Sequence, residues 1–305
     1  MVRARGRPGW QPGRSSPLDP AGRRICALPV ICLVVSDIRH QPEVPTHAQA
    51  YAAGDVIGRH RHDEHQLIYV STGVIAITTE HGSWVAAPDR AVWIPAGIWH
   101  EHRFYGRTSF HSVGFTSVTA PLPGDAPTVV AAGGLIRELV IACTEAGLRP
   151  AEERRIRAVL IDRLGRVQVQ PLSLPRAQDP RLAQACQLVT DDLSQPRAIT
   201  WLAHATSTSD RTLTRLFRTE FGTTYPQWRT QTRILHALIH LAEGAPVTET
   251  ARRCGFATTS AFIDTFTRTM GQTPGHYRTP AQLPADSRRH ALPRPSRGRA
   301  VRPIR

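Results

Sequence analysis

The spacing of apolar residues changes along the chain, from short strand-like runs in the first half to helical spacing in the second. Between Gln49 and Phe115, Gly, Asp and Pro turns separate aliphatic and aromatic runs such as LIYV, VIAITT, AVWIP and FHSVGF. Such runs predict a small antiparallel barrel or sandwich. Residues 134–148, 152–165 and most of 179–278 carry apolar residues three and four apart, which indicates amphipathic helices. We therefore expect an α+β, multidomain protein.

The second half contains an internal repeat. Two pairs of positions recur at an offset of 48 and five further pairs at an offset of 49. The first copy contributes Ile199, Ala203, Leu213, Phe217, Gly222, Thr224 and Arg229, and the second contributes Val247, Ala251, Phe262, Phe266, Gly271, Thr273 and Arg278. Each copy predicts a short helix with a buried Ala, a tight turn and a second helix. This arrangement is typical of a helix-turn-helix unit.

The second helix of each unit has an outward face that is available to DNA. The first face holds Ser209, Asp210, Arg211, Thr214, Arg215 and Arg218, and the second holds Thr258, Thr259, Ser260, Ile263 and Asp264. Arg side chains at helical spacing favour phosphate or base contacts, although a solvated helix face is the simpler alternative. Residues 226–243 predict a joining helix about 27 Å long. That length can hold two recognition helices in successive major grooves, about 34 Å apart.

About 100 C-terminal residues resemble the AraC/XylS family of bacterial transcription regulators. The matching residues are Leu202, Ala203, Ser209, Arg211, Leu213, Arg215, Phe217, Gly222, Trp228 and Arg229 in the first unit, and Val247, Ala251, Cys254, Gly255, Phe256, Ser260, Phe262, Phe266, Met270, Gly271, Thr273, Pro274, Tyr277 and Arg278 in the second. The resemblance implies that both units bind a double-stranded DNA operator, mainly through their recognition helices. Ser207 stands where a turn Gly is commoner, and Ala257 where a polar cap is usual.

The first half resembles the two motifs of the cupin barrel. Gly54, His60, His62, Gln66 and Gly73 follow the first motif, G-x5-H-x-H-x3-E-x6-G, with Gln66 in place of Glu. In the second motif, G-x5-P-x-G-x2-H-x3-N, the residues are Asp89, Pro95, Gly97, His100 and Phe104, so Asp89 and Phe104 replace Gly and Asn. The resemblance implies a metal site of three His and one carboxylate, in which Gln66 takes the place of the carboxylate.

Three imidazoles are a plausible ligand set for a transition metal. Alternate strand positions point His60 and His62 the same way, and a facing strand can bring His100 across the barrel. Nitrogen ligands suit Ni, Zn, Fe or Cu. The alternative is that these residues only pack or bind an organic effector. We expect surface or structural positions for His65, His81, His102 and His111, and we expect Trp93, Trp99 and Phe104 to flank the pocket or fill the core.

Net charge by itself says little about DNA binding. The chain has 38 basic residues, all Arg, against 24 acidic residues, a net charge of +14. Residues 1–40 and 279–305 each hold seven Arg, against two and one Asp respectively. Within the predicted folded regions, residues 175–278 hold twelve Arg against eight acids, whereas residues 41–130 hold five Arg against eight. The basic excess in folded sequence therefore lies with the repeat.

Cysteine usage and hydropathy favour the cytoplasm. The five cysteines are odd in number and form no C-x-x-C pair, which fits a reducing compartment. The apolar run 25–35 is too short to span a bilayer, and no small-x-small cleavage site follows it. We therefore expect neither export nor a membrane partner.

The predicted organisation is a cupin β-barrel followed by an all-α domain of two helix-turn-helix units joined by a linker helix. In chain order we expect a disordered or artefactual N-terminal extension, a cupin-like sensory domain, a helical dimerisation or linker region, a linker, the DNA-binding domain and a basic disordered tail, at 1–40, 41–125, 126–170, 171–180, 181–279 and 280–305.

The predicted function is transcription regulation in response to a small molecule or metal ion. The alternative is a metal-dependent cupin enzyme with an appended DNA-binding module. Regulation is favoured because no clear general acid or base lies beside the three His, and Gln66 removes the charged ligand that a metalloenzyme commonly uses. We therefore expect no catalytic residues and no cofactor beyond a divalent metal at this site. Expected partners are an operator, the effector, a second copy of the chain and, for an activator, RNA polymerase.

Overall fold

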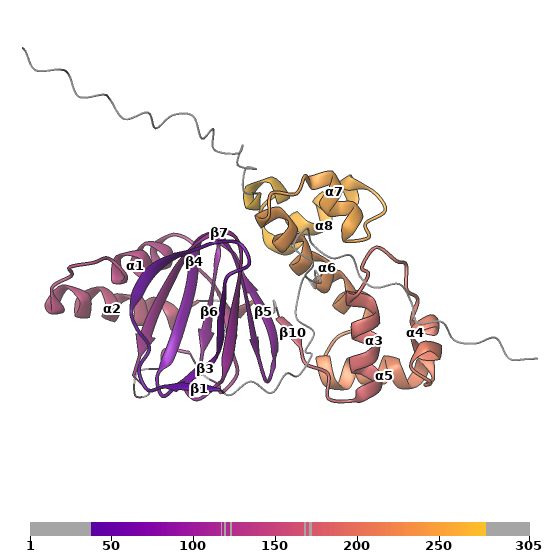
Figure 1. The fold of residues 1–305 in the computed structure, drawn as a ribbon, viewed down its shortest axis with the longest axis horizontal. Helices are drawn as coiled ribbons and strands as arrows, with labels where there is room; N and C mark the ends of the chain where they lie inside the picture. Colours follow the sequence, from indigo (N-terminus) through magenta and orange to yellow (C-terminus); the bar gives the residue numbers. More distant parts are fainter. Residues whose placement is uncertain are drawn as a thin grey trace, which may run out of the picture.

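The computed structural model describes residues 38–278, except 117, 119, 123, 168, 171 and 172. Almost all of the predicted N-terminal extension and all of the basic tail lie outside this part of the chain. Figure 1 shows a β-rich domain beside a helical domain. None of the helices in the described part is both long and apolar enough to cross a membrane.

The described strands form one curved sheet. They are β1 (Arg39–Gln41), β2 (His47–Tyr51), β3 (Val56–His62), β4 (His65–Thr79), β5 (Gly82–Ala86), β6 (Arg90–Ile94), β7 (His100–Phe115), β8 (Thr128–Ala131), β9 (Val169–Gln170) and β10 (Ser173–Pro175). The main path runs β1-β3-β7-β4-β6-β8-β9; β2 pairs with β7, while β5 pairs with β4 and β10. The long strands β4 and β7 pair antiparallel from His65↔Phe115 to Thr79↔His100.

The two faces of this sheet bury different residues. Ile68, Val70 and Phe104 belong to the cluster that fills the barrel, whereas Leu67, Tyr69, Trp93, Val113 and Phe115 pack on the opposite face beneath two helices. Those helices are α1 (Leu135–Cys143) and α2 (Pro150–Leu164), and they lie on the side of the barrel away from the helical domain (Figure 1). Trp93 therefore does not flank the predicted pocket, because strand alternation turns it outward.

Segments predicted as linkers contribute strands. β8 pairs with β6 through Arg90↔Ala131 and its neighbours. β10, within the predicted linker 171–180, pairs with β5, and its central residue Leu174 is buried. Backbone hydrogen bonds and one buried leucine therefore hold the start of this connection against the barrel.

The helical domain contains both helix-turn-helix units. Its elements are α3 (Pro180–Thr190), α4 (Ile199–Ala205), α5 (Asp210–Phe221), α6 (Tyr225–Ala242), α7 (Val247–Arg253), α8 (Thr259–Met270) and the 3-10 helix η1 (Pro274–Tyr277). The predicted buried alanines, Ala203 and Ala251, are indeed buried. Ser207, in place of the usual turn Gly, adopts a φ of 53°. A Thr224/Gln227 capping box begins α6, which satisfies backbone donors at its first turn.

Gly255, in the turn of the second unit, lies against the loop that precedes the first unit. Its φ is +71°, and a Cβ there would lie 2.2 Å from the carbonyl oxygen of Leu193, a backbone atom of the α3–α4 loop. We expect Gly255→Ala to lower the free energy of unfolding of the helical domain by about 2–5 kcal/mol, the sum of a strained φ and overpacking.

The matched control is Gly271→Ala. Gly271 has a similar φ of +77° but open space around its Cβ position, so only the conformational strain of about 1–2 kcal/mol applies. Urea unfolding of both variants, followed by helical circular dichroism, measures the difference. Equal losses would show that the Leu193 contact imposes no constraint.

Candidate effector site and nucleic-acid interface

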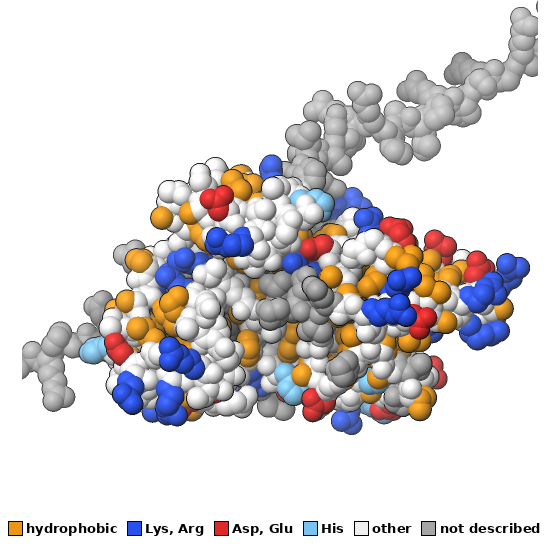
Figure 2. All heavy atoms as spheres, turned by 180° about the vertical axis from the view of Figure 1, so that it is seen from behind, with side chains coloured by type: hydrophobic (Ala, Val, Ile, Leu, Met, Phe, Trp, Pro, Cys, Tyr) orange, Lys and Arg blue, Asp and Glu red, His pale blue; other side chains and the backbone are white. Residues whose placement is uncertain are grey.

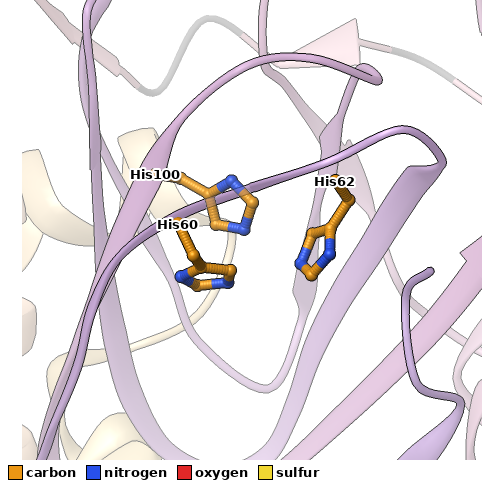
Figure 3. Close-up of side chains that lie close together, drawn as sticks. All are labelled: His60, His62 and His100. Carbon is orange, nitrogen blue, oxygen red and sulfur yellow. The ribbon is translucent and has the colours of Figure 1, made fainter. Parts of the chain in front are cut away.

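Three predicted histidines meet inside the barrel. His60 and His62 occupy alternate positions on β3, and His60 pairs directly with His100 on β7. Each residue offers one ring nitrogen, and these nitrogens lie within 4.8 Å of one another. All three side chains are buried. Figure 3 shows the rings side by side between the strands. The three histidines that the spacing of the two cupin motifs singled out therefore do lie together in the structure.

Backbone carbonyls orient all three rings in the same way. Nδ1 lies 2.8 Å from the Gly58 oxygen in His60, 3.1 Å from the Gln41 oxygen in His62 and 3.0 Å from the Ile98 oxygen in His100. Carbonyls only accept hydrogen bonds, so each Nδ1 carries the proton and Nε2 keeps its lone pair. Nε2 of His62 and of His100 is buried without a hydrogen-bond partner among the described residues. This outer-shell pattern is the one that fixes metal-binding imidazoles.

Burial keeps the cluster neutral. Desolvation lowers the pKa of His60 and His62 below the usual value, and it lowers the pKa of His100 to about 3, with help from the neighbouring His60. Neutral imidazoles need lose no proton before they ligate a cation. The donor set therefore fits a divalent transition metal, held by His60, His62 and His100.

Gln66 is buried on β4, and its side-chain amide is hydrogen-bonded to Ser112. Its Nε2 donates a hydrogen bond of 2.9 Å to the Ser112 hydroxyl, and its Oε1 is buried without a partner among the described residues. An amide oxygen is a neutral ligand, so this position adds no negative charge to the site.

His102 is the residue that motif spacing missed. Of the two positions expected for it, surface or structural, the structure excludes the surface: the side chain is completely buried, and both ring nitrogens lack hydrogen-bond partners in the described structure. Its ring centroid lies 5.0 Å from that of His100 and 5.4 Å from that of His60. His102 follows His100 by two residues, so strand alternation was the signal that placed it on the same face.

An aromatic cluster continues from His102 into the barrel. Tyr51 stacks on Phe104 at a centroid distance of 3.9 Å, and Phe110 packs edge-on against both. His102 lies 5.8 Å from Phe110. Phe104 is completely buried in the barrel core, and its ring centroid lies 6.5 Å from that of His102. This side of the site is apolar and aromatic.

The first candidate DNA-binding face lies on α5. Ser209 caps the helix, and its Oγ accepts a hydrogen bond of 3.2 Å from the backbone N–H of Thr212. Asp210, Arg211, Arg215 and Arg218 are exposed, while Thr214 is half-buried. None of the three Arg side chains has an acidic partner within the described residues. Figure 2 shows Arg side chains standing out on the surface around α3–α5, so this face can meet anionic phosphates.

The second candidate face lies on α8. Thr258 caps this helix through a 3.1 Å hydrogen bond from the Ala261 N–H to its Oγ1. Ser260, Ile263 and Asp264 are exposed, and Thr259 is half-buried. This face contains one acid and no Arg among its predicted contacts, so it offers an apolar side chain and hydroxyl groups rather than positive charge.

Comparisons with known proteins agree with both halves of this description. Family models match a helix-turn-helix domain over residues 202–280 and a cupin domain over residues 48–113. The HTH-type transcriptional regulator NimR of Escherichia coli (strain K12) is 30% identical over 239 residues, which cover 77% of this chain and 86% of NimR. The chain belongs to the AraC family of transcriptional regulators.

Other similarities cover less of the chain or are weaker. The transcriptional activator RhaR of Salmonella schwarzengrund (strain CVM19633) is 33% identical over 92 residues, 30% of this chain and 32% of RhaR. An AraC-type regulator structure from Chromobacterium violaceum is 25% identical, with a TM-score of 0.31, and covers 32% of this chain and 89% of its own. ToxT from Vibrio cholerae O395 is 11% identical over 77% of this chain and 96% of ToxT, with a TM-score of 0.34.

Membership of the AraC family confirms the predicted resemblance, the order of a cupin region before a helical domain, and DNA-binding regulation rather than catalysis. The residues of α5 and α8 that contact DNA, and the effector, stay predictions.

Proposed function

We propose that this AraC-family regulator binds an operator through α5 and α8 and that its cupin domain senses a divalent transition metal. The observation that carries the proposal is the cluster of three buried imidazoles, whose Nδ1 atoms are all engaged by carbonyls and whose nitrogens lie within 4.8 Å of one another. A bound ion would act as an allosteric signal or a structural clamp, since no carboxylate of the described residues joins the three imidazoles in the ligand group.

An organic effector is the second candidate. It is favoured by the neutral Gln66 amide and by the stacked Tyr51 and Phe104 rings near His102. An aromatic surface with a few polar groups is typical of small-molecule pockets.

The first experiment combines metal analysis with operator binding. Operator fragments are selected from random DNA with the full-length protein, and the purified protein is analysed for bound metals after growth in media that contain Zn²⁺, Ni²⁺, Fe²⁺ or Cu²⁺. The proposal requires a bound ion and an operator affinity that a chelator changes. If the protein contains no metal, and neither added ion nor chelator changes its operator affinity, the result would favour the organic effector.

Restoring the cupin carboxylate should strengthen the site. Gln66→Glu adds one negative charge beside three imidazoles, so we expect at least about tenfold tighter Zn²⁺ binding, equivalent to about 1.4 kcal/mol. Gln272→Glu, at an exposed position between α8 and η1, adds the same charge in the helical domain and should leave Zn²⁺ affinity unchanged. Isothermal titration measures both; equal affinities would place Gln66 outside the site.

We propose further that the regulator acts in the cytoplasm as a homodimer through α1 and α2. Two residues of these helices support this assembly: Leu135 is 50% exposed and Val159 is 41% exposed, and apolar surface of this kind favours association. These helices lie on the side of the barrel away from the helical domain (Figure 1), so pairing there leaves both DNA-binding faces free. If the regulator activates transcription, RNA polymerase is its further partner.

A further inference from the structure

Asp89 and Arg90 connect the barrel to the second helix-turn-helix unit. The hydroxyl of Tyr277, in η1, donates a hydrogen bond of 2.7 Å to Asp89 Oδ2. Arg90 Nη1 donates to the same carboxylate oxygen, while Arg90 Nη2 lies 3.3 Å from the carbonyl oxygen of Met270, the last residue of α8. Two consecutive residues of the barrel thus hold both η1 and the C-terminal end of α8.

This contact is buried and charged. The Arg90 side chain is 3% exposed, and the Tyr277 ring packs against Phe266 of α8 with their centroids 5.4 Å apart. A guanidinium buried in this way is stable only while its partners remain in place, because an unpaired buried charge is costly. The contact therefore favours one position of the second unit against the barrel.

The contact explains a departure from the cupin motif. Asp89 replaces the glycine that begins the second motif, and its carboxylate reaches the helical domain rather than the histidine cluster. Its partner Tyr277 belongs to the motif of the DNA-binding half. Contact between the two domains accounts for this replacement.

The strand that carries the contact also leads to the histidines. β6 begins at Arg90 and ends at Ile94, which pairs with Gln66. In the loop that follows, the Gly97 N–H donates to the His62 carbonyl at 2.7 Å, and the Ile98 carbonyl accepts from His100 Nδ1 at 3.0 Å. Five residues of strand cover about 16 Å. A shift of the imidazoles thus has a short, hydrogen-bonded route to the domain contact.

The contact leaves the DNA-binding face of α8 uncovered. Ser260, Ile263 and Asp264 lie near the start of the helix and are exposed, whereas the barrel meets α8 at its last residue. Asp89 and Arg90 are therefore suited to position the unit rather than to mask it.

We propose that Asp89, Arg90 and Tyr277 form an interdomain latch that transmits the state of the histidine cluster along β6 to the second helix-turn-helix unit. The signal at the cluster rests on the proposed function, but the latch itself does not. Coupling between two sites is reciprocal. If the state of the histidine cluster changes DNA binding through the latch, DNA binding must also change the state of the cluster.

The test uses hydrogen exchange of the full-length protein with and without a selected operator fragment. We expect operator binding to change exchange in residues 90–98, which contain β6 and the loop before His100. Tyr277→Phe removes only the hydroxyl that reaches Asp89, so this variant should still bind the operator but lose the change. Asp89→Asn, which weakens the partner of Arg90, should lose it as well.

Tyr225→Phe is the matched control. The Tyr225 hydroxyl donates to the Arg197 carbonyl within the helical domain, so its removal should leave the response of residues 90–98 intact. A wild type without that response, or a Tyr277→Phe variant that keeps it, would overturn the latch.

A second measurement separates the latch from metal sensing. If Zn²⁺ changes the operator affinity of the wild type, the Tyr277→Phe variant should bind Zn²⁺ as tightly as the wild type, but its operator affinity should be the same with and without Zn²⁺. A variant whose operator affinity responds to Zn²⁺ as strongly as that of the wild type would contradict the latch. An exchange response that depends on Tyr277, with no effect of metal on DNA binding, would support the latch and reject the metal as the signal.

Discussion

Replacing His60 and His62 together by Ala should abolish metal binding and the effect of a chelator on operator affinity. Two of the three converging imidazoles are lost, so only one of the three nitrogens that lie within 4.8 Å of one another remains. Even outer partners of metal ligands are worth 10- to 100-fold in affinity, so we expect more than about a hundredfold weaker Zn²⁺ binding. Elemental analysis and fluorescence anisotropy with operator DNA measure the two effects.

The control for this pair is His81→Ala, an exposed histidine in the β4–β5 turn. It removes an imidazole from the same domain without touching the cluster and should keep both metal and chelator response. If the double variant holds as much metal as the wild type, the ion binds elsewhere. If neither binds metal and both bind the operator alike, the three histidines serve packing or an organic ligand.

Replacing Arg211 by Ala should weaken specific operator binding by about 1–3 kcal/mol if its guanidinium reads a guanine edge. Arg211 lies in the first turn of α5, exposed and without an acidic partner among the described residues. A phosphate contact would instead lower the affinity for all sequences alike and flatten the salt dependence of binding. Titrations with operator and random DNA at several salt concentrations distinguish these cases.

The control is Arg149→Ala, at the N-terminal end of α2. Its side chain is 82% exposed, and the position lies on the side of the barrel away from the helical domain. It removes the same formal charge far from α5, so operator affinity should stay near that of the wild type. Equal losses of operator affinity in both variants would show that the Arg211 effect comes from net charge alone. An Arg211→Ala variant with unchanged operator affinity would show that this part of α5 does not contact DNA.

The helices of the helical domain could be predicted closely from the local sequence pattern. Helix-turn-helix units depend on near-neighbour spacing: a small residue, a turn and apolar positions three and four apart, all read directly from a sequence that repeats itself. The predicted joining helix 226–243 differs from α6, Tyr225–Ala242, by one residue at each end. The outward residues of α5 and α8 followed from the same periodicity, because 3.6 residues per turn fixes which side chains face away from the core.

The histidine cluster could be described in full only from the sequence and the tertiary structure together. The sequence by itself determined His60, His62 and His100, because alternation on a strand and the two cupin motifs are local patterns. The same alternation places His102 on their face, whereas only the tertiary structure decided that its ring is completely buried beside them and that Gln66 bonds to Ser112. It also turned Trp93 outward under α1 and α2 and linked Asp89 to Tyr277 across 188 residues of chain. These contacts depend on how curved strands and separate domains meet in space, and no spacing along the chain encodes that meeting.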